Sequence, residues 1–325
     1  MKYSGLEEKS YPYLQTPLYK GRLTNGLTVY LHPKPDFKET YGMVTVGFGA
    51  ANTVFKTKKQ TEFVTYPTGI AHFLEHKLFE MENARDVLQE FSKLGADANA
   101  YTSFYQTSYL FSTAAEVLPS LALLQEFLRD VSFTEESVER EKAIIAQEIE
   151  MYQDEPDSRL YNEILASLYP GSPLQDDIAG NVASIQDITV QSLKENFEAF
   201  YHPQNMTLFL VGNFELEDVW KGIQEQQATY LYQPVLVEHQ PLANNPVLPH
   251  GTSQMEVASP KLAIGVRGNG QLEVTSLYRF RLSLSLLFSM LFGWTSMRHR
   301  DLYEQGKIDS SFSFHLEVRL TYHFL

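Results

Sequence analysis

Alternating apolar and polar positions predict β-strands at the start of the chain. Residues 23–31 place Asn25 and Gly26 between β-forming side chains, which is a strong signal for a hairpin. Residues 41–55 alternate in the same way and predict a second strand that ends near Gly49. We therefore expect the chain to open as a β-meander.

Helical patterns follow the first strands. Thr68 is a suitable N-cap for a helix over residues 69–81, and Pro67 ends the preceding structure. A long helix is expected after Thr134, running to about Gln153. On similar grounds we expect helices over residues 83–94, 117–130, 160–168, 188–201 and 215–226, and strands over residues 98–112 and 206–211.

The composition changes to that of a linker over residues 233–252, which contain four prolines and two asparagines. After it the pattern restarts with a strand over 262–266, a helix over 278–292 and a strand over 310–320. We predict an N-terminal domain over 1–232, a linker over 233–252 and a second domain over 253–325. We expect this second domain to be incomplete, because the sequence ends within a predicted strand.

Composition and charge exclude several classes of function. The chain has no cysteine, so disulfides, cysteine nucleophiles and thiolate metal sites are excluded. A transition metal would then have to be held by histidines and carboxylates. The net charge of −14 disfavours nucleic acid as a partner. No apolar run is long enough to span a membrane and no secretory signal is visible, so we expect a soluble, cytoplasmic protein.

The strongest chemical signal is a His-x-x-Glu-His motif within the predicted helix over 69–81. His72 and His76 lie one helical turn apart on the same face, so both imidazoles can reach one metal ion. Glu75 lies beside them, where a general base for an attacking water would be placed. The alternative is two histidines on an ordinary amphipathic helix.

A catalytic zinc ion needs a third protein ligand and one open position. The long helix offers Glu141 and Glu148, which are two turns apart on one face, with apolar residues between them. Other glutamates of this helix are typical of a solvated surface. The helix-face argument alone leaves Glu148 open between a metal ligand and a solvated carboxylate.

These motifs together resemble the pitrilysin/insulinase family (M16) of zinc peptidases, whose members carry the inverted His-x-x-Glu-His motif. The resemblance lies in the hairpin at residues 25–27, the first metal helix over 69–79, the Glu-x6-Glu spacing of 141–148, the strand over 95–103 and the segment 201–212. Within the family, the chain is most similar to the bacterial branch associated with 5-aminopentanol modification of elongation factor P.

The resemblance implies a fold and a set of roles. The fold would be α+β, with two similar domains, each a mostly antiparallel sheet packed by helices. One zinc ion per chain would be bound by His72, His76 and Glu148. Glu75 would activate the attacking water, and Glu141 would orient a metal ligand. The strand formed by Ala98, Asn99, Ala100, Tyr101 and Thr102 would pair with the substrate backbone as an added β-strand.

The sequence also departs from the family pattern. Members carry an Arg–Tyr pair in the second domain, but the corresponding residues 302–309 lack it, and Arg298, Arg300 and Tyr303 have a different spacing.

We predict a zinc metalloendopeptidase acting on unfolded or extended peptides, with a homologous subunit as partner in a homo- or heterodimer. The alternative is a non-catalytic helper subunit of a peptidase-like pair involved in protein modification. A purely structural zinc domain is disfavoured, since such sites close with four ligands.

Overall fold

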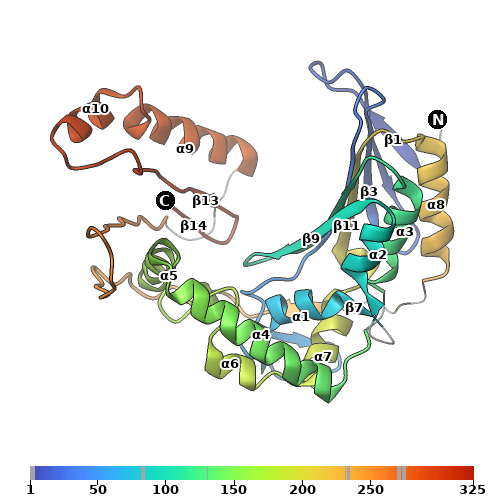
Figure 1. Ribbon diagram of the computed structural model, residues 1–325, viewed down its shortest axis with the longest axis horizontal. Coiled ribbons are helices and arrows are strands. Elements are labelled where there is room, and N and C mark those ends of the chain that lie inside the picture. The colour runs from blue at the N-terminus through green and yellow to red at the C-terminus, as the bar shows by residue number, and fades with distance from the viewer. Residues whose placement is uncertain are drawn as a thin grey trace. The chain divides into compact units, whose positions relative to one another are not determined.

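The computed structural model describes residues 4–81, 85–129, 131–230, 232, 235–268, 272 and 276–325 (Figure 1). By compactness the chain divides into two units. Unit 1 comprises Met1–Asp154 and Asp176–Pro241, and unit 2 comprises Glu155–Gln175 and Leu242–Leu325. The predicted helix start at Asn83, the predicted helix end at Asp130 and residues 233–234 of the predicted linker lie outside the described residues. The predicted domain boundaries, 1–232, 233–252 and 253–325, stay a prediction.

Unit 1 is built on a seven-stranded sheet with the order β1-β2-β3-β11-β4-β10-β9. Neighbouring strands are antiparallel except for β3 and β11, which run parallel. The strands are β1 (Leu6–Lys9), β2 (Leu18–Arg22), β3 (Thr28–Pro33), β4 (Thr40–Val46), β9 (Ala96–Thr102), β10 (Thr107–Thr113) and β11 (Met206–Gly212). The predicted α+β class with a mostly antiparallel sheet is confirmed for this unit.

Three helices cover one face of this sheet: α2 (Val87–Lys93), α3 (Val117–Glu126) and α8 (Leu216–Ala228) (Figure 1). Alternate strand residues point toward them and are fully buried, among them Val29, Leu31, Tyr109 and Leu208. This alternation is the period of two that a half-covered sheet requires. The sheet and the three helices therefore enclose the main core, and β9 is left as an edge strand.

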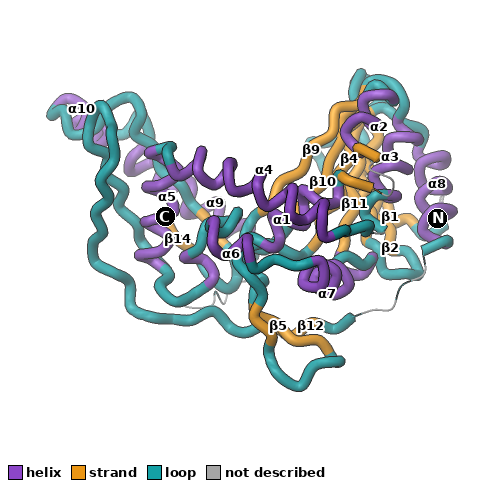
Figure 2. The backbone as a smooth tube through the Cα atoms, turned by 60° about the horizontal axis from the view of Figure 1, so that its bottom comes forward, coloured by secondary structure: helices purple, strands orange, loops and turns teal. Residues whose placement is uncertain are grey.

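A second group of helices in unit 1 carries the candidate metal ligands and the candidate base. Helix α1 (Ile70–Leu78) packs against α4 (Glu135–Gln153), α7 (Val190–Phe200) and strand β9, and α4 also packs against α6 (Val182–Gln186). A small sheet of β5 (Val54–Thr57), β6 (Val64–Thr65) and β12 (Val237–His239) lies beside these helices (Figure 2). A two-stranded ladder, β7 (Glu80–Met81) with β8 (Arg85–Asp86), follows α1.

Unit 2 contains three α-helices and one β-ladder among its described residues: α5 (Pro156–Leu168), α9 (Leu277–Phe292), α10 (Met297–Glu304), and β13 (Glu317–Val318) paired with β14 (His323–Phe324). The end of the chain is held by backbone hydrogen bonds in both directions between Val266 and Leu325, at 2.9 and 3.0 Å. Tyr169 also donates its hydroxyl to the His323 carbonyl at 3.0 Å. No residue of α9 is buried.

Several predicted elements differ from the structure. The single strand expected over 98–112 is wrong, because residues 103–106 form a turn that separates β9 from β10. The strand expected to end near Gly49 ends at Val46, and a separate strand starts at Val54. Residues 262–266 are not a strand, and of the strand expected over 310–320 only Glu317–Val318 forms. The helix expected over 69–81 is α1, which ends at Leu78 because Glu80–Met81 form β7. The predicted N-cap Thr68 is wrong, because the cap position is Gly69 and no side chain caps the helix. The helix expected from Thr134 to about Gln153 corresponds to α4.

Candidate metal centre

Helix α1 starts at a position that only glycine fits well. Gly69 precedes the helix with φ at +88°, a left-handed conformation that side chains disfavour. A Cβ built on Gly69 would lie 2.3 Å from the Ala179 carbonyl oxygen, which is far inside van der Waals contact. This close approach lets the N-terminus of α1 sit against the segment before α6. The motif residues His72 and Glu75 are then buried with the rest of the helix.

Helix α4 supplies the carboxylates that face α1. It begins with a capping box, in which the Thr134 side chain accepts from the Ser137 amide and the Ser137 hydroxyl accepts from the Thr134 amide. Ile145 and Ile149 anchor the helix in the core. Glu141 and Glu148 lie on a face that looks toward α1, so two packed helices hold the two halves of the site.

His72, His76 and Glu148 form a group of possible metal ligands. One nitrogen or oxygen atom from each residue lies within 4.8 Å of the other two, and all three side chains are partly shielded from solvent. The Nε2 atoms of His72 and His76 lie 3.8 Å and 3.5 Å from the two carboxylate oxygens of Glu148. The two imidazole rings are 4.5 Å apart between centroids and inclined by 63°. Both Nε2 atoms therefore face the same carboxylate.

Glu141 contacts the other side of the His76 ring. The Nδ1–H of His76 donates to Glu141 Oε1 at 2.9 Å. In the neutral ring, the lone pair that can bind a metal is then on Nε2. This is the contact that a ligand-orienting carboxylate makes. The Nδ1 atom of His72 is buried without a hydrogen-bond partner among the described residues.

The pKa values of the motif residues are strongly perturbed. Burial, assisted by the adjacent His76, lowers the pKa of His72 to about 3, so this imidazole is neutral at pH 7. Burial also acts to lower the pKa of His76, but the hydrogen bond and charge of Glu141 and the charges of Glu148 and Glu75 outweigh it and raise the pKa. Burial raises the pKa of Glu75, against the opposing effects of the Thr102 hydrogen bond and the His76 charge.

The donor set fits a zinc ion. Two imidazole nitrogens and one carboxylate are the ligands that zinc takes in hydrolytic enzymes, where a fourth position stays open. The neutral state of His72 is the state that can bind a metal. The negative charges of Glu148 and Glu141 beside the two rings compensate for the charge of a cation.

Glu75 is buried on the same helix, with an exposed fraction of 7%. Its Oε2 atom accepts a hydrogen bond from Thr102 Oγ1 at 2.6 Å. This contact was not foreseen from the sequence, because Thr102 was expected to act through its backbone. Thr102 is the last residue of β9, and this strand packs directly against α1. A sequence analysis that ended the strand at Thr102 would have placed its side chain near the motif helix.

The predicted substrate-pairing residues lie on the edge strand of the sheet. β9 pairs with β10 along Ala96–Thr102, and it has no partner on its other side among the described strands. Asn99 and Tyr101 are exposed, whereas Ala98, Ala100 and Thr102 are half-buried toward α1 and α2. The free backbone edge therefore runs directly to the Glu75 contact.

The arginines and the tyrosine noted near the C-terminal end of the sequence belong to unit 2. Arg298, Arg300 and Tyr303 lie on α10 of unit 2, where Arg300 forms an exposed ion pair with Glu304 at 3.8 Å.

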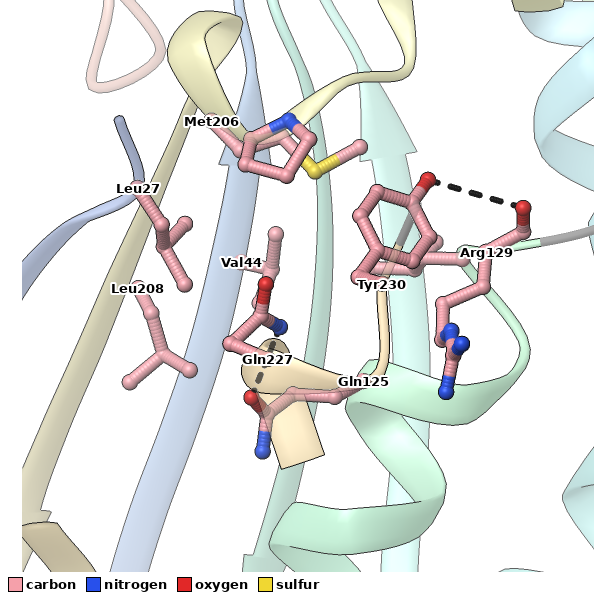
Figure 3. Close-up of a pocket in the computed structure, with 10 residues that line it drawn as sticks. Leu27, Val44, Gln125, Arg129, Met206, Leu208, Gln227 and Tyr230 are labelled. Carbon is pink, nitrogen blue, oxygen red and sulfur yellow. Dashed lines mark hydrogen bonds between the residues drawn. The ribbon is translucent and has the colours of Figure 1, made fainter. Parts of the chain in front are cut away.

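A separate small cavity lies between the sheet and helices α3 and α8, and its volume is about 20 Å³ (Figure 3). Val44 and Leu208 line it from the sheet, and Gln227 donates to Gln125 at 3.0 Å across it. This volume suits about one water molecule. None of its lining residues belongs to the metal group, so we interpret it as a packing defect.

Comparison with known proteins identifies the family of the chain. Residues 64–182 match the family model described as insulinase (peptidase family M16), and residues 187–324 match the one described as peptidase M16 inactive domain. The chain therefore belongs to the insulinase family of peptidases, M16, and the resemblance predicted from its motifs is confirmed.

Individual relatives support the assignment. The chain is 42% identical over 308 residues to the uncharacterized zinc protease YmfH of Bacillus subtilis (strain 168), a match that covers 94% of this chain and 72% of YmfH. It is 30% identical over 203 residues to a probable mitochondrial-processing peptidase subunit beta of Schizosaccharomyces pombe, covering 61% of this chain and 42% of that protein.

A solved structure gives the same result. The crystal structure of a putative M16-like peptidase from Alicyclobacillus acidocaldarius superimposes with a TM-score of 0.91 at 35% identity, covering 96% of this chain and 74% of that one. Among the helices of the described residues, none is long and apolar enough to cross a membrane.

Proposed function

We propose that this chain is a zinc metalloendopeptidase that hydrolyses peptide bonds in unfolded or extended peptides. The observation that carries the proposal is the group of His72, His76 and Glu148, whose donor atoms converge within 4.8 Å, with the buried Glu75 on the same helix. Relatives named as zinc proteases support it.

His72 and His76 would bind the zinc ion through Nε2, and Glu148 through its carboxylate. Zinc, when bound in such a three-ligand site, polarises a substrate carbonyl and makes a water molecule more acidic. Glu141 would hold the His76 ring in the binding orientation through the 2.9 Å hydrogen bond to Nδ1.

Glu75 would act as the general base. Its Oε2 atom is engaged by Thr102, so its Oε1 atom would accept the proton of the attacking water. The same atom would then donate that proton to the departing amine nitrogen, which restores the carboxylate for the next cycle.

The free edge of β9 would bind the peptide. An extended peptide that pairs with Ala98–Thr102 through its backbone would be held with little regard to its side chains. Such pairing favours unfolded or extended segments, because most backbone groups of a folded substrate are already hydrogen-bonded.

The test compares wild type with Glu75→Gln on unfolded peptides, with metal content measured on the same samples. We expect the variant to keep zinc and to lose hydrolysis, because an amide does not accept the proton. Peptide cleavage by Glu75→Gln at the wild-type rate would remove Glu75 from this role.

A second candidate is a helper subunit in a peptidase-like pair that acts in protein modification. The match of residues 187–324 to a domain described as inactive favours it. A helper role predicts zinc binding and peptide binding without turnover, either alone or with a partner. We favour the enzyme, because a helper has no need of the buried Glu75 base.

We also propose a homologous subunit as partner. The relative named as subunit beta of a processing peptidase supports it, since that name describes one member of an assembly. The predicted cytoplasmic location and the link to elongation factor P modification stay predictions.

A further inference from the structure

The hydroxyl of Thr102 makes the closest polar contact to the candidate base. Thr102 Oγ1 donates to Glu75 Oε2 at 2.6 Å, and it is the one hydrogen-bond donor to this carboxylate among the residues that the structure describes. Glu75 is 7% exposed, so water competes little for the contact. A hydrogen bond from a hydroxyl to a buried carboxylate is a strong one and fixes the direction of the carboxylate plane.

Thr102 is itself held from the neighbouring strand. It lies opposite Thr107 in the β9–β10 register, with the two Oγ1 atoms 3.3 Å apart. Thr107 is fully buried and donates its hydroxyl to the Phe48 carbonyl at 2.9 Å. The Thr107 proton is thus committed to Phe48, which leaves the Thr102 proton for Glu75. Both threonines are β-branched, so few rotamers are open to them.

The turn after Thr102 is anchored to a second segment of the chain. Within the turn, the Ser103 amide donates to the Gln106 carbonyl at 2.8 Å. The amides of Ala50 and Ala51 donate to the carbonyls of Ser103 and Phe104 at 2.9 and 2.8 Å. A Cβ on Gly49 would lie 2.3 Å from the Ser103 carbonyl oxygen, so the segments are in close contact. The backbone that carries Thr102 is therefore fixed on both sides.

We propose that Thr102 is a positioning residue for Glu75, in addition to any backbone pairing with a peptide. It anchors Oε2 to the rigid end of β9, so that Oε1 stays directed toward the proton it is to accept. This inference rests on the proposed function, because positioning has a catalytic consequence only if Glu75 is the base. The competing account is that the Thr102 hydroxyl merely stabilises the β9–β10 hairpin.

A double-mutant cycle on the metal-free protein separates the two accounts without any activity measurement. The variants are Thr102→Val, Glu75→Met and the pair, followed by urea unfolding. If Thr102 acts on Glu75, Thr102→Val lowers the free energy of unfolding less in the Glu75→Met background than in the wild-type background, whatever the sign of the Glu75→Met effect itself. An equal effect of Thr102→Val in the two backgrounds would overturn the contact. Thr102→Ala replaces the valine variant if that one does not fold.

Thr113→Val is the matched control for this cycle. Thr113 lies at the other end of β10, is buried, and donates its hydroxyl to the Gly95 carbonyl at 3.0 Å. Its loss is expected to destabilise the sheet and to add to the effect of Glu75→Met. Equal non-additivity for Thr113 and Thr102 would show a general effect of the sheet and overturn the proposal.

Peptide turnover supplies the second test. Thr102→Val is expected to lower kcat by roughly 10- to 100-fold with little change in KM, because the base is misdirected while the peptide still pairs with β9. Thr102→Ser keeps the hydroxyl and is expected to restore most of kcat. A valine variant that changes only KM, or a serine variant as slow as valine, would overturn positioning. If wild type shows no turnover even in the presence of a complementary subunit, the proposed function fails, and the unfolding cycle still decides the Thr102 contact.

Discussion

At the scale of single residues, the candidate centre depends on how burial and charge act together. Burial keeps His72 neutral, which prepares it for a metal, whereas Glu141 and Glu148 place negative charge beside His76. Without a cation the group would hold several carboxylates close together in a partly dry site, which is unfavourable. This imbalance is what a zinc ion would relieve.

The first prediction concerns the ligands. The wild-type chain is expected to bind about one zinc ion, and His76→Ala is expected to lose it, because a three-ligand site cannot spare a ligand. Metal content after dialysis measures this. His250→Ala, at an exposed position, serves as control and keeps full zinc. A His76→Ala variant with full zinc occupancy would show that the metal lies elsewhere.

A second prediction concerns Glu141, which touches a ligand rather than the metal. Glu141→Ala removes the acceptor from His76 Nδ1, so the ring loses its fixed orientation. We expect zinc affinity to fall by roughly 10- to 100-fold, the usual effect of losing such a contact. Competition with a chelator measures it. Glu150→Ala, exposed on the same helix, controls for lost charge, and equal effects of the two variants would contradict the role of Glu141.

At the scale of elements, the sequence predicted the two helices that carry the ligands, since the apolar period and the Thr134 cap of α4 are local signals. The contact of Glu141 with His76 follows from the packing of those helices, and the sequence alone suggested it only through the family resemblance. The Thr102–Glu75 contact was missed because it depends on the turn over 103–106. The residues of this turn are rich in aromatic side chains, which favour strands, so one continuous strand was predicted over 98–112. Local pattern finds elements, whereas contacts between elements depend on tertiary register.

The third prediction tests the start of α1. Gly69→Ala places a methyl group 2.3 Å from the Ala179 carbonyl oxygen at a positive φ, so the helix start must shift. We expect a loss of about 1–3 kcal/mol in the free energy of unfolding, together with weaker zinc binding. The control is Gly222→Ala in α8, whose Cβ would meet its nearest neighbour at 3.9 Å. It is expected to be neutral or to stabilise by about 1 kcal/mol. Equal stabilities of the two variants would contradict this account of α1.

At the scale of the whole molecule, unit 1 contains every residue of the proposed catalytic group, and unit 2 presents an unburied helix. On α9, Leu286 is 57% exposed and Leu287 47% exposed, and the exposed Met290 continues the apolar series. Exposed apolar surface of this kind on one helix is typical of a contact with another polypeptide.

The last prediction follows from this apolar helix and from residues 302–309, where the resemblance implies an Arg–Tyr pair that the sequence does not carry. Zinc binding needs only unit 1, so the isolated chain is expected to bind zinc. Peptide turnover is expected to be low in dilute solution and to rise with a complementary subunit, which supplies further substrate contacts. Turnover per chain is measured over a range of concentrations, with and without an excess of Glu75→Gln protein or of a homologous subunit.

Leu286→Asp should abolish the increase in turnover that the added subunit gives, whereas Ser283→Asp, exposed on the same helix, should not. Full turnover by dilute monomers, unaffected by either substitution, would show that unit 1 needs no partner to hold its peptide.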